Sequence, residues 1–353
     1  MRRGLIAWSK AELPSAVFER RIVRAQQAMT AAQIDALVLY TNNTRTAGVS
    51  WFVGFIPYWS EGLLVIPRSG TPALVVGLSK RVQFWLERTC HVPVHNASRV
   101  GVEAGRIIAE IGSGASVGVA DLDGLPAGVA DDMGSSGSGL RLVDATELVQ
   151  RLRGAAEPSE IALSLHALEI AHRALATVGA VGAGMGAILA RVEREARLRG
   201  AEEIYLAAAP DLIASRHLRR IEGDEPLGRS FALRATVAYK GHWIRLIRTF
   251  GADGAGLARA QERLASAVAA LPDTLGFADA ASWLIEGCRI AQPLEPLAGS
   301  RIADPVPLPE GALVSAQASY AIDGAPVLIG ASALLGRRGE AAALLCQPEF
   351  ADV

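Results

Sequence analysis

The first 150 residues alternate between short apolar runs and longer stretches in which apolar residues recur at helical spacing. Residues 15–33 form one such stretch and predict an amphipathic helix. Apolar runs bounded by turn residues, which are typical of buried strands, lie at residues 35–41, 62–67 and 72–77. Strands and helices that alternate in this way indicate an α/β domain. Residues 131–141, rich in Gly and Ser, predict a flexible loop near the end of that domain.

The second part of the chain shows longer helical stretches and segments that resemble β-hairpins. Pro158 and Ser159 precede Glu160 and predict the start of a helix that continues to about Val178. Further helices are predicted at residues 186–200 and 256–271, and hairpin segments at residues 231–250, 311–320 and 325–335. Helices on one side of a curved antiparallel sheet define an α+β domain. We therefore predict two domains, residues 1–153 and residues 154–353.

Composition narrows the classes of function. The chain has 35 Lys plus Arg against 36 Asp plus Glu, so it is close to neutral. A nucleic-acid-binding protein needs a concentrated basic surface, and no apolar run here has the length of a signal peptide or a membrane span. We expect neither nucleic acid nor a membrane as a partner.

The cysteines are few and scattered. Cys90, Cys288 and Cys346 are odd in number, and their spacing supports neither a disulfide framework nor a metal cluster. We expect them to be small buried apolar residues in a cytoplasmic protein.

Four segments together resemble one known family. They are ERRIVRAQQAMTAAQIDALVLYT (19–41), LRGAAEPSEIALSLHALEIAHRAL (152–175), AYKGHWIRLIRTFG (238–251) and LPEGALVSAQASY (308–320). Their order and spacing are similar to those of the aminopeptidase P, prolidase and creatinase family. The resemblance covers essentially the whole chain, with a shorter stretch around residues 270–305. It implies an α/β N-terminal domain followed by an α+β pita-bread domain.

The resemblance also locates the positions that bind metal in the family. Active metallopeptidases of this family hold two metal ions with two Asp, one His and two Glu. The four carboxylate positions fall here on Arg234, Arg245, Gln317 and Gly330, and residues 251–310 contain no histidine. Guanidinium groups stay protonated and repel divalent cations, and Gln or Gly offers at most a neutral oxygen. We therefore expect no metal cofactor and no metallopeptidase mechanism.

The substituted arginines suggest a different ligand. With Lys240 and Gly241 in the turn of the hairpin, Arg234 and Arg245 become cross-strand neighbours, and like charges so placed are destabilising. Either an anion lies between them, held bidentately, or that face is open to water. Arg248 is expected to complete an anion clamp. Gln317 could orient the ligand, and His242 either packs in the hairpin or contacts the ligand.

His217 is the candidate acid or base. The segment AAAPDLIASRHLRR (207–220) resembles the family segment whose histidine binds substrate in the peptidases and transfers protons in creatinase. Imidazole suits general acid–base catalysis near neutral pH. The alternative is an exposed loop histidine whose pKa is lowered by Arg216, Arg219 and Arg220. His172, in the predicted entry helix, is expected to be structural.

Two classes of function remain open. The first is a metal-independent enzyme that acts on a small anionic or carboxylate substrate, at a C–N bond, with His217 as acid or base. The second is an inactive member of the family that serves as a partner subunit or binding protein. A histone-chaperone-like use of the fold is a third, which the lack of an acidic tail disfavours. No cofactor is expected, and a homodimer or a heterodimer with a related chain is.

Overall fold

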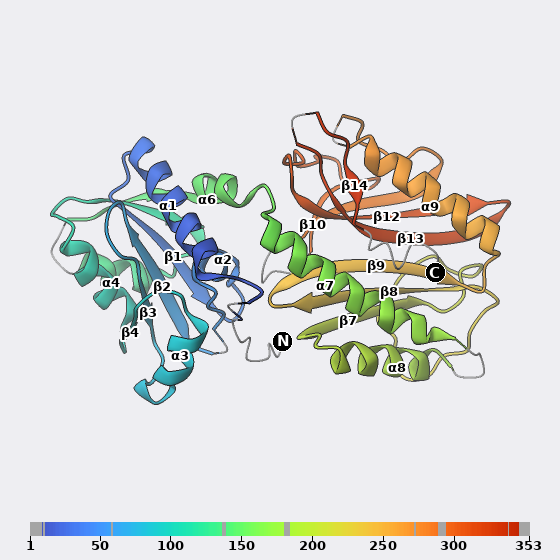
Figure 1. The fold of residues 1–353 in the computed structure, drawn as a ribbon, viewed down its shortest axis with the longest axis horizontal. Helices are drawn as coiled ribbons and strands as arrows, with labels where there is room; N and C mark the ends of the chain where they lie inside the picture. The colour runs from blue at the N-terminus through green and yellow to red at the C-terminus, as the bar shows by residue number, and fades with distance from the viewer. Residues whose placement is uncertain are drawn as a thin grey trace. The chain divides into compact units, whose positions relative to one another are not determined.

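The computed structural model describes residue 9 and residues 11–57, 59–135, 139–179, 184–271, 273–288, 294–337 and 339–345. The chain divides into two units, the first ending at Gly154 and the second beginning at Ala155. The predicted boundary, after residue 153, lies one residue from this division. Figure 1 shows both units, coloured along the chain.

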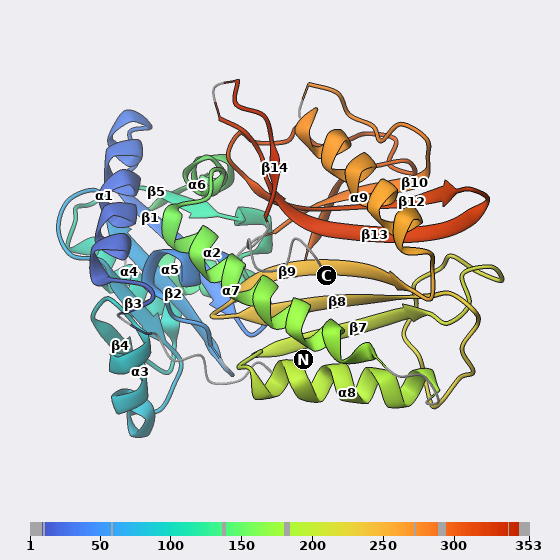
Figure 2. The same ribbon diagram turned by 45° about the vertical axis from the view of Figure 1, so that its right-hand side comes forward.

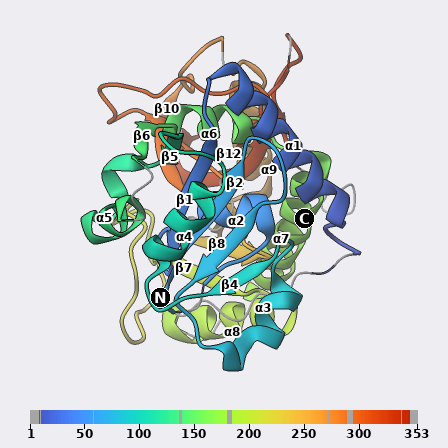
Figure 3. The same ribbon diagram turned by 90° about the vertical axis from the view of Figure 1, so that its left-hand side faces the viewer.

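The N-terminal unit is built around a six-stranded mixed sheet with strand order β4–β3–β2–β1–β5–β6. The strands are β1 (Ala36–Asn42), β2 (Glu61–Pro67), β3 (Ala73–Val76), β4 (Val94–Asn96), β5 (Ser116–Ala120) and β6 (Arg141–Asp144). The helices are α1 (Ser15–Ala31), α2 (Ala47–Val53), α3 (Gln83–Thr89), α4 (Val100–Ala109), α5 (Ala127–Gly134) and α6 (Thr146–Arg153), with short 3-10 turns at Lys80–Val82 and Leu122–Gly124. In Figure 3, where this unit faces the viewer, the helices α1 and α5 lie on opposite sides of the strands.

Both faces of this sheet are buried. Successive residues of a strand point to opposite faces, so Leu37 and Leu39 of β1 join the core that contains α1, α2 and α6. Ala36 and Val38 join a separate core that contains α4 and α5. Apolar runs with little alternation, as in residues 62–67, reflect this burial on two sides.

The second unit contains an eight-stranded sheet in which every described strand pair is antiparallel. The strand order is β11–β10–β12–β13–β9–β8–β7, and β14 pairs with β13. The strands are β7 (Glu203–Ala209), β8 (Phe231–Tyr239), β9 (His242–Phe250), β10 (Ala280–Gly287), β11 (Glu295–Gly299), β12 (Leu313–Ile322), β13 (Ala325–Leu334) and β14 (Ala343–Leu344).

Three helices cover one face of this sheet: α7 (Pro158–Leu175), α8 (Met185–Leu198) and α9 (Gly254–Ala269). The helix α7 packs against β8 and β9, α8 against β7, and α9 against β12 and β13. Figures 1 and 2 show all three on the same side, which we call the helix face. The start of α7 is fixed by Pro158 in its first turn and by a capping box between Glu157 and Glu160.

The predicted fold class is confirmed: an α/β unit precedes an α+β unit with helices on one side of an antiparallel sheet. The predicted loop at residues 131–141 is wrong at its start, because α5 continues to Gly134. The strands β7, β10 and β11 were not predicted. None of the described helices combines the length and apolar character that crossing a lipid bilayer requires.

Candidate functional site

The strand register aligns the predicted site positions across the second sheet. Arg234 of β8 pairs with Ile247 of β9, and Ile247 pairs with Gly330 of β13. Gly330 in turn pairs with Gln317 of β12. This register follows from the turn at Lys240 and Gly241, whose φ values of 47° and 78° suit a two-residue hairpin turn.

A second row lies two residues along the strands, and its side chains therefore point to the same side as the first row. It consists of Thr236, Arg245, Ser332, Ser315 and Glu286. We call this side, which carries Arg234, Gln317 and the second row, the polar face. It is opposite the helix face. The structure thus brings Arg234, Arg245, Gln317 and Gly330 together on one face of the sheet.

Arg245 is neutralised by the chain itself. Its guanidinium Nη1 forms an ion pair with Glu286 Oε2, and the two side chains are only 12% and 6% exposed. Arg245 Nε also donates a hydrogen bond to Thr236 Oγ1 at 3.0 Å. Gln317 Nε2 donates to the same Glu286 oxygen at 3.1 Å. The anion expected beside Arg245 is therefore Glu286, and Gln317 is held by that carboxylate.

Arg234 has no such partner. It lies diagonally from Arg245 because its direct neighbour is Ile247, and its guanidinium forms no hydrogen bond or ion pair with any residue in the described ranges. Burial and then the charge of Arg245 lower the pKa of Arg234, while Glu286 raises it. One positive charge on the polar face is thus only partly balanced.

Two serine hydroxyls nearby are also unsatisfied. Within the described part of the chain, Ser315 Oγ and Ser319 Oγ are buried and have no hydrogen-bond partner. Both point to the side of Gln317, which lies between them in β12. A buried hydroxyl without a partner is unfavourable, so these groups favour a polar ligand or water beside Gln317.

The residues at the mapped positions do not fit a pair of divalent ions. Arg234 and Arg245 bring positive charge, and Gln317 is bonded to Glu286. A Cβ on Gly330 would lie 3.0 Å from both Gln317 Cβ and Ile247 Cδ1, so a side chain at this position would require these neighbours to shift. Nowhere in the described ranges do three or more His, Cys, Asp or Glu side chains gather as a potential metal site. Divalent ions need oxygen, nitrogen or thiolate donors that balance their charge.

His217 is in the segment between β7 and β8 and is exposed. Its backbone N–H donates to Ser215 Oγ at 3.2 Å. The next residue, Leu218, packs against a small apolar cluster that includes Ala232 and Ile247, and these two residues lie beside Arg234 on the polar face. The loop that carries His217 is therefore anchored next to the polar face. Of the neighbouring arginines, Arg219 is paired with Glu225.

Arg248 and His242 lie elsewhere. Alternation along β9 directs both to the helix face, so the prediction that Arg248 joins Arg234 and Arg245 in one clamp is wrong. Arg248 Nη2 instead donates a hydrogen bond to His172 Nδ1 of α7 at 2.6 Å. His242 is buried at the end of the hairpin, opposite Tyr239.

Comparison with known proteins agrees with this architecture. Residues 21–154 match the family model of the Creatinase/Prolidase N-terminal domain. No curated protein matches the chain. Among solved structures, the prolidase of Pyrococcus horikoshii OT3 aligns with a TM-score of 0.68 at 16% identity, over 93% of this chain and 98% of that one. The X-Pro aminopeptidase of Thermotoga maritima aligns with a TM-score of 0.68 at 18% identity, over 94% and 97%.

The same fold also occurs outside the peptidases. The N-terminal domain of the FACT complex subunit SPT16 from chickpea aligns with a TM-score of 0.57 at 13% identity, over 94% of this chain and 96% of that one. At such identities the likenesses show the fold alone. Residues 21–154 thus match the N-terminal domain of the creatinase/prolidase family, and the whole chain shares the two-domain fold, with a pita-bread second domain, of the prolidase and X-Pro aminopeptidase structures. The predicted resemblance is confirmed.

Sequence reasoning missed Glu286 and Ser315. Glu286 is on β10, in the stretch around residues 270–305 where no family motif guides the alignment. Its signal is a lone acid in the apolar run Trp283–Cys288, which is short enough for a strand. Ser315 is within a matched segment, but its burial beside Gln317 depends on the sheet register.

Proposed function

We propose that this protein binds a small carboxylate-bearing molecule on the polar face, with Arg234 as the principal contact and without a metal ion. The observation that carries the proposal is the partly buried guanidinium of Arg234, which has no hydrogen-bond or ion-pair partner among the described residues. A carboxylate suits this group because guanidinium N–H donors match its two oxygens.

Neighbouring groups complete the ligand site. Gln317 and the buried hydroxyl of Ser315 belong to the same face, and both can bond to polar ligand atoms. Glu286 already compensates Arg245, so the net positive charge of the face is about that of one guanidinium. A small monocarboxylate or the end of a dicarboxylate therefore fits better than a polyphosphate.

Metal independence is part of the proposal. Three of the four family carboxylate positions carry Arg or Gln side chains here, and the fourth is Gly330, which has no side chain and where a Cβ would be in tight contact with Gln317 and Ile247. The negative charge of Glu286 is taken up by Arg245 and Gln317. A pair of divalent ions beside these arginines would lack the bridging carboxylates that dinuclear metal sites use.

A catalytic role is a second candidate, favoured by the position of His217. Its loop is anchored by Leu218 beside the polar face, and imidazole transfers protons near neutral pH. An enzyme of this kind would act at a C–N bond of the carboxylate-bearing substrate with His217 as acid or base. Two measurements separate this candidate from an inactive member of the family that serves as a partner subunit or binding protein. The first is the turnover of N-acylated or N-carbamoylated amino acids by the unaltered protein, and the second is carboxylate binding by His217→Gln. If no turnover is found and the variant still binds the carboxylate, the inactive-member alternative is the correct one.

Calorimetric titration with succinate and acetate tests the binding function. We expect saturable binding that Arg234→Gln weakens about 10- to 100-fold, as for the loss of a charge-assisted hydrogen bond. Arg248→Gln, the same substitution on the helix face, should change the affinity less than about twofold. Binding no tighter than that of sulfate, or equal losses in both variants, contradicts the proposal.

Assembly and location belong to the proposal as well. We propose a dimer, either of this chain with itself or with a related chain, in the cytoplasm. Mass spectrometry under native conditions on protein from its source tests the assembly. A monomer with no partner would contradict it.

A further inference from the structure

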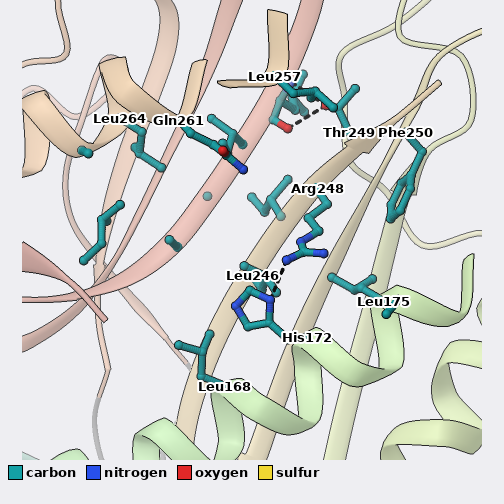
Figure 4. A pocket seen from close by; sticks show the side chains of 18 of the residues that line it. Leu168, His172, Leu175, Leu246, Arg248, Thr249, Phe250, Leu257, Gln261 and Leu264 are labelled. Carbon is teal, nitrogen blue, oxygen red and sulfur yellow. Dashed lines mark hydrogen bonds between the residues drawn. The ribbon is translucent and has the colours of Figure 1, made fainter. Parts of the chain in front are cut away.

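A large apolar pocket lies on the helix face, on the other side of the sheet from the polar face. It has a volume of about 670 Å³ and lies between α7, α9 and the strands β9 and β13. Its apolar lining includes Leu168, Leu175, Leu246, Phe250, Leu257 and Leu264. Figure 4 shows these side chains around the space, with Gln261 on α9 at its edge. Pockets that bind small molecules have this size and apolar character.

One cation lies inside this apolar lining. The guanidinium of Arg248 is directed at His172, and Nη2 donates to His172 Nδ1 at 2.6 Å. Burial lowers the pKa of His172 to about 4, with a further contribution from the charge of Arg248. The imidazole is therefore neutral at physiological pH and accepts the hydrogen bond. Arg248 forms no ion pair with a carboxylate in the described part of the chain.

This charge is unfavourable without an anion. Burial lowers the pKa of Arg248, which means that desolvation of the charged guanidinium is not compensated locally. The other titratable group in the lining, Glu262, is exposed on α9 and forms no ion pair with Arg248. The hydrogen bond to a neutral imidazole does not balance the charge of a guanidinium that has no carboxylate partner among the described residues of an apolar pocket.

We propose that this pocket is a second binding site, for a straight-chain monocarboxylate of medium length whose carboxylate pairs with Arg248 and whose alkyl chain lies along the apolar lining. The inference is independent of the proposed function on the polar face. The single guanidinium and the apolar lining together define the class of ligand. One guanidinium matches one carboxylate, and the leucine-rich lining matches an unbranched chain.

Other ligand classes fit less well. A nucleotide or another polyanion would leave charges without partners in an apolar lining. A neutral hydrocarbon would fill the pocket but leave Arg248 uncompensated. A small anion such as acetate would pair with Arg248 but leave the lining empty. Charge complementarity and apolar area together are satisfied by an amphipathic monoanion.

Calorimetric titration of the full chain with decanoate, below its micellar concentration, tests the inference. In the Arg234→Gln variant, which lacks the carboxylate contact of the polar face, we expect one molecule per chain, with affinity that rises about fourfold for each CH₂ added from hexanoate to decanoate. Acetate and decanol should bind this site at least about tenfold more weakly. Absence of decanoate binding, or equal affinity for decanol, would overturn the proposal.

Three variants assign the binding to the pocket. Arg248→Gln should weaken decanoate binding about tenfold or more, whereas Arg234→Gln on the polar face should leave it unchanged. Ala265→Trp places a bulky side chain in the pocket at an exposed position of α9 and should abolish binding while Arg248 is retained. Thermal unfolding verifies that each variant is folded. If decanoate binds equally well to both Arg248→Gln and Ala265→Trp, the ligand lies elsewhere and the inference is wrong.

Discussion

Arg245 and Glu286 form a buried ion pair on the polar face, although they belong to strands β9 and β10, which are not adjacent in the sheet. The carboxylate of Glu286 supplies the negative charge that Arg245 needs at this buried position. It also explains why two arginines on one face of a hairpin are tolerated: Glu286 compensates Arg245 directly and acts on Arg234 at longer range.

The first prediction concerns this pair. Glu286→Gln should lower the free energy of unfolding by about 3 to 5 kcal/mol, because it leaves the buried Arg245 charge without a partner. Urea denaturation measures the change. Replacing both partners, with Arg245→Met and Glu286→Met, should cost clearly less than the single substitution. Glu103→Gln, which removes a surface pair with Arg106, is the matched control and should cost under about 1 kcal/mol.

Gly330 supports a second prediction. Gly330→Ala should destabilise the protein by about 1 to 3 kcal/mol, because the added Cβ would press on Gln317, Ile247 and the Ala316 carbonyl oxygen at 3.0 to 3.2 Å. Gly128→Ala, where nothing lies within 4 Å of the new Cβ, should not destabilise. A Gly330→Ala variant as stable as the unaltered protein would show that the strands yield easily and that a carboxylate could be accommodated there.

The third prediction is a pH dependence centred on Glu202. Burial raises the pKa of Glu202 to about 7 from its ordinary value of 4.5, although the Gly241 N–H donates to its carboxylate at 3.0 Å. The folded state therefore binds the proton more tightly than the unfolded state. The associated stability is present below pH 4.5 and is lost as the pH rises through about 7.

Glu202→Gln keeps the hydrogen-bond acceptor and removes the charge. At pH 8 this variant should be more stable than the unaltered protein by about 1 to 3 kcal/mol, and at pH 4 the two should be nearly equal. Denaturation at a series of pH values measures this difference. The exposed Glu222→Gln provides the comparison and should leave the pH profile unchanged. A constant difference between pH 4 and pH 8 would show that Glu202 titrates normally.

Much of this architecture could be predicted from the sequence. Apolar periodicity located α1, α7, α8 and α9, because long amphipathic stretches carry a strong signal. The Lys240–Gly241 turn set the register of the β8–β9 hairpin, and with it the common face of Arg234 and Arg245. Family motifs then placed Gln317 and Gly330 near them.

Other features depend on contacts that a single sequence does not encode locally. Glu286 pairs with Arg245 across 41 residues, through strands whose alignment only the assembled sheet defines. Arg248 was expected to join Arg234 in one anion clamp. Because the two-residue turn pairs Arg234 with Ile247, residues an even number of positions apart across the hairpin point to opposite faces, and Arg248 is therefore on the other face from Arg234. The cross-strand partner of Arg248 is Leu233, and both side chains point to the helix face. The His172–Arg248 contact joins α7 to β9 and likewise depends on packing.

The central proposal is that this protein holds no pair of metal ions, because positive and amide side chains on the polar face occupy positions where the family resemblance locates metal ligands. Equilibrium dialysis of the purified protein against Mn²⁺, Co²⁺ and Zn²⁺, followed by elemental analysis, tests it most directly. We predict that the unaltered protein takes up no stoichiometric amount of these metal ions at the polar face, where Glu286 is the acid in the second row. Glu286→Gln should therefore leave the metal content unchanged. One or two ions bound per chain in the unaltered protein and lost in Glu286→Gln would contradict the account.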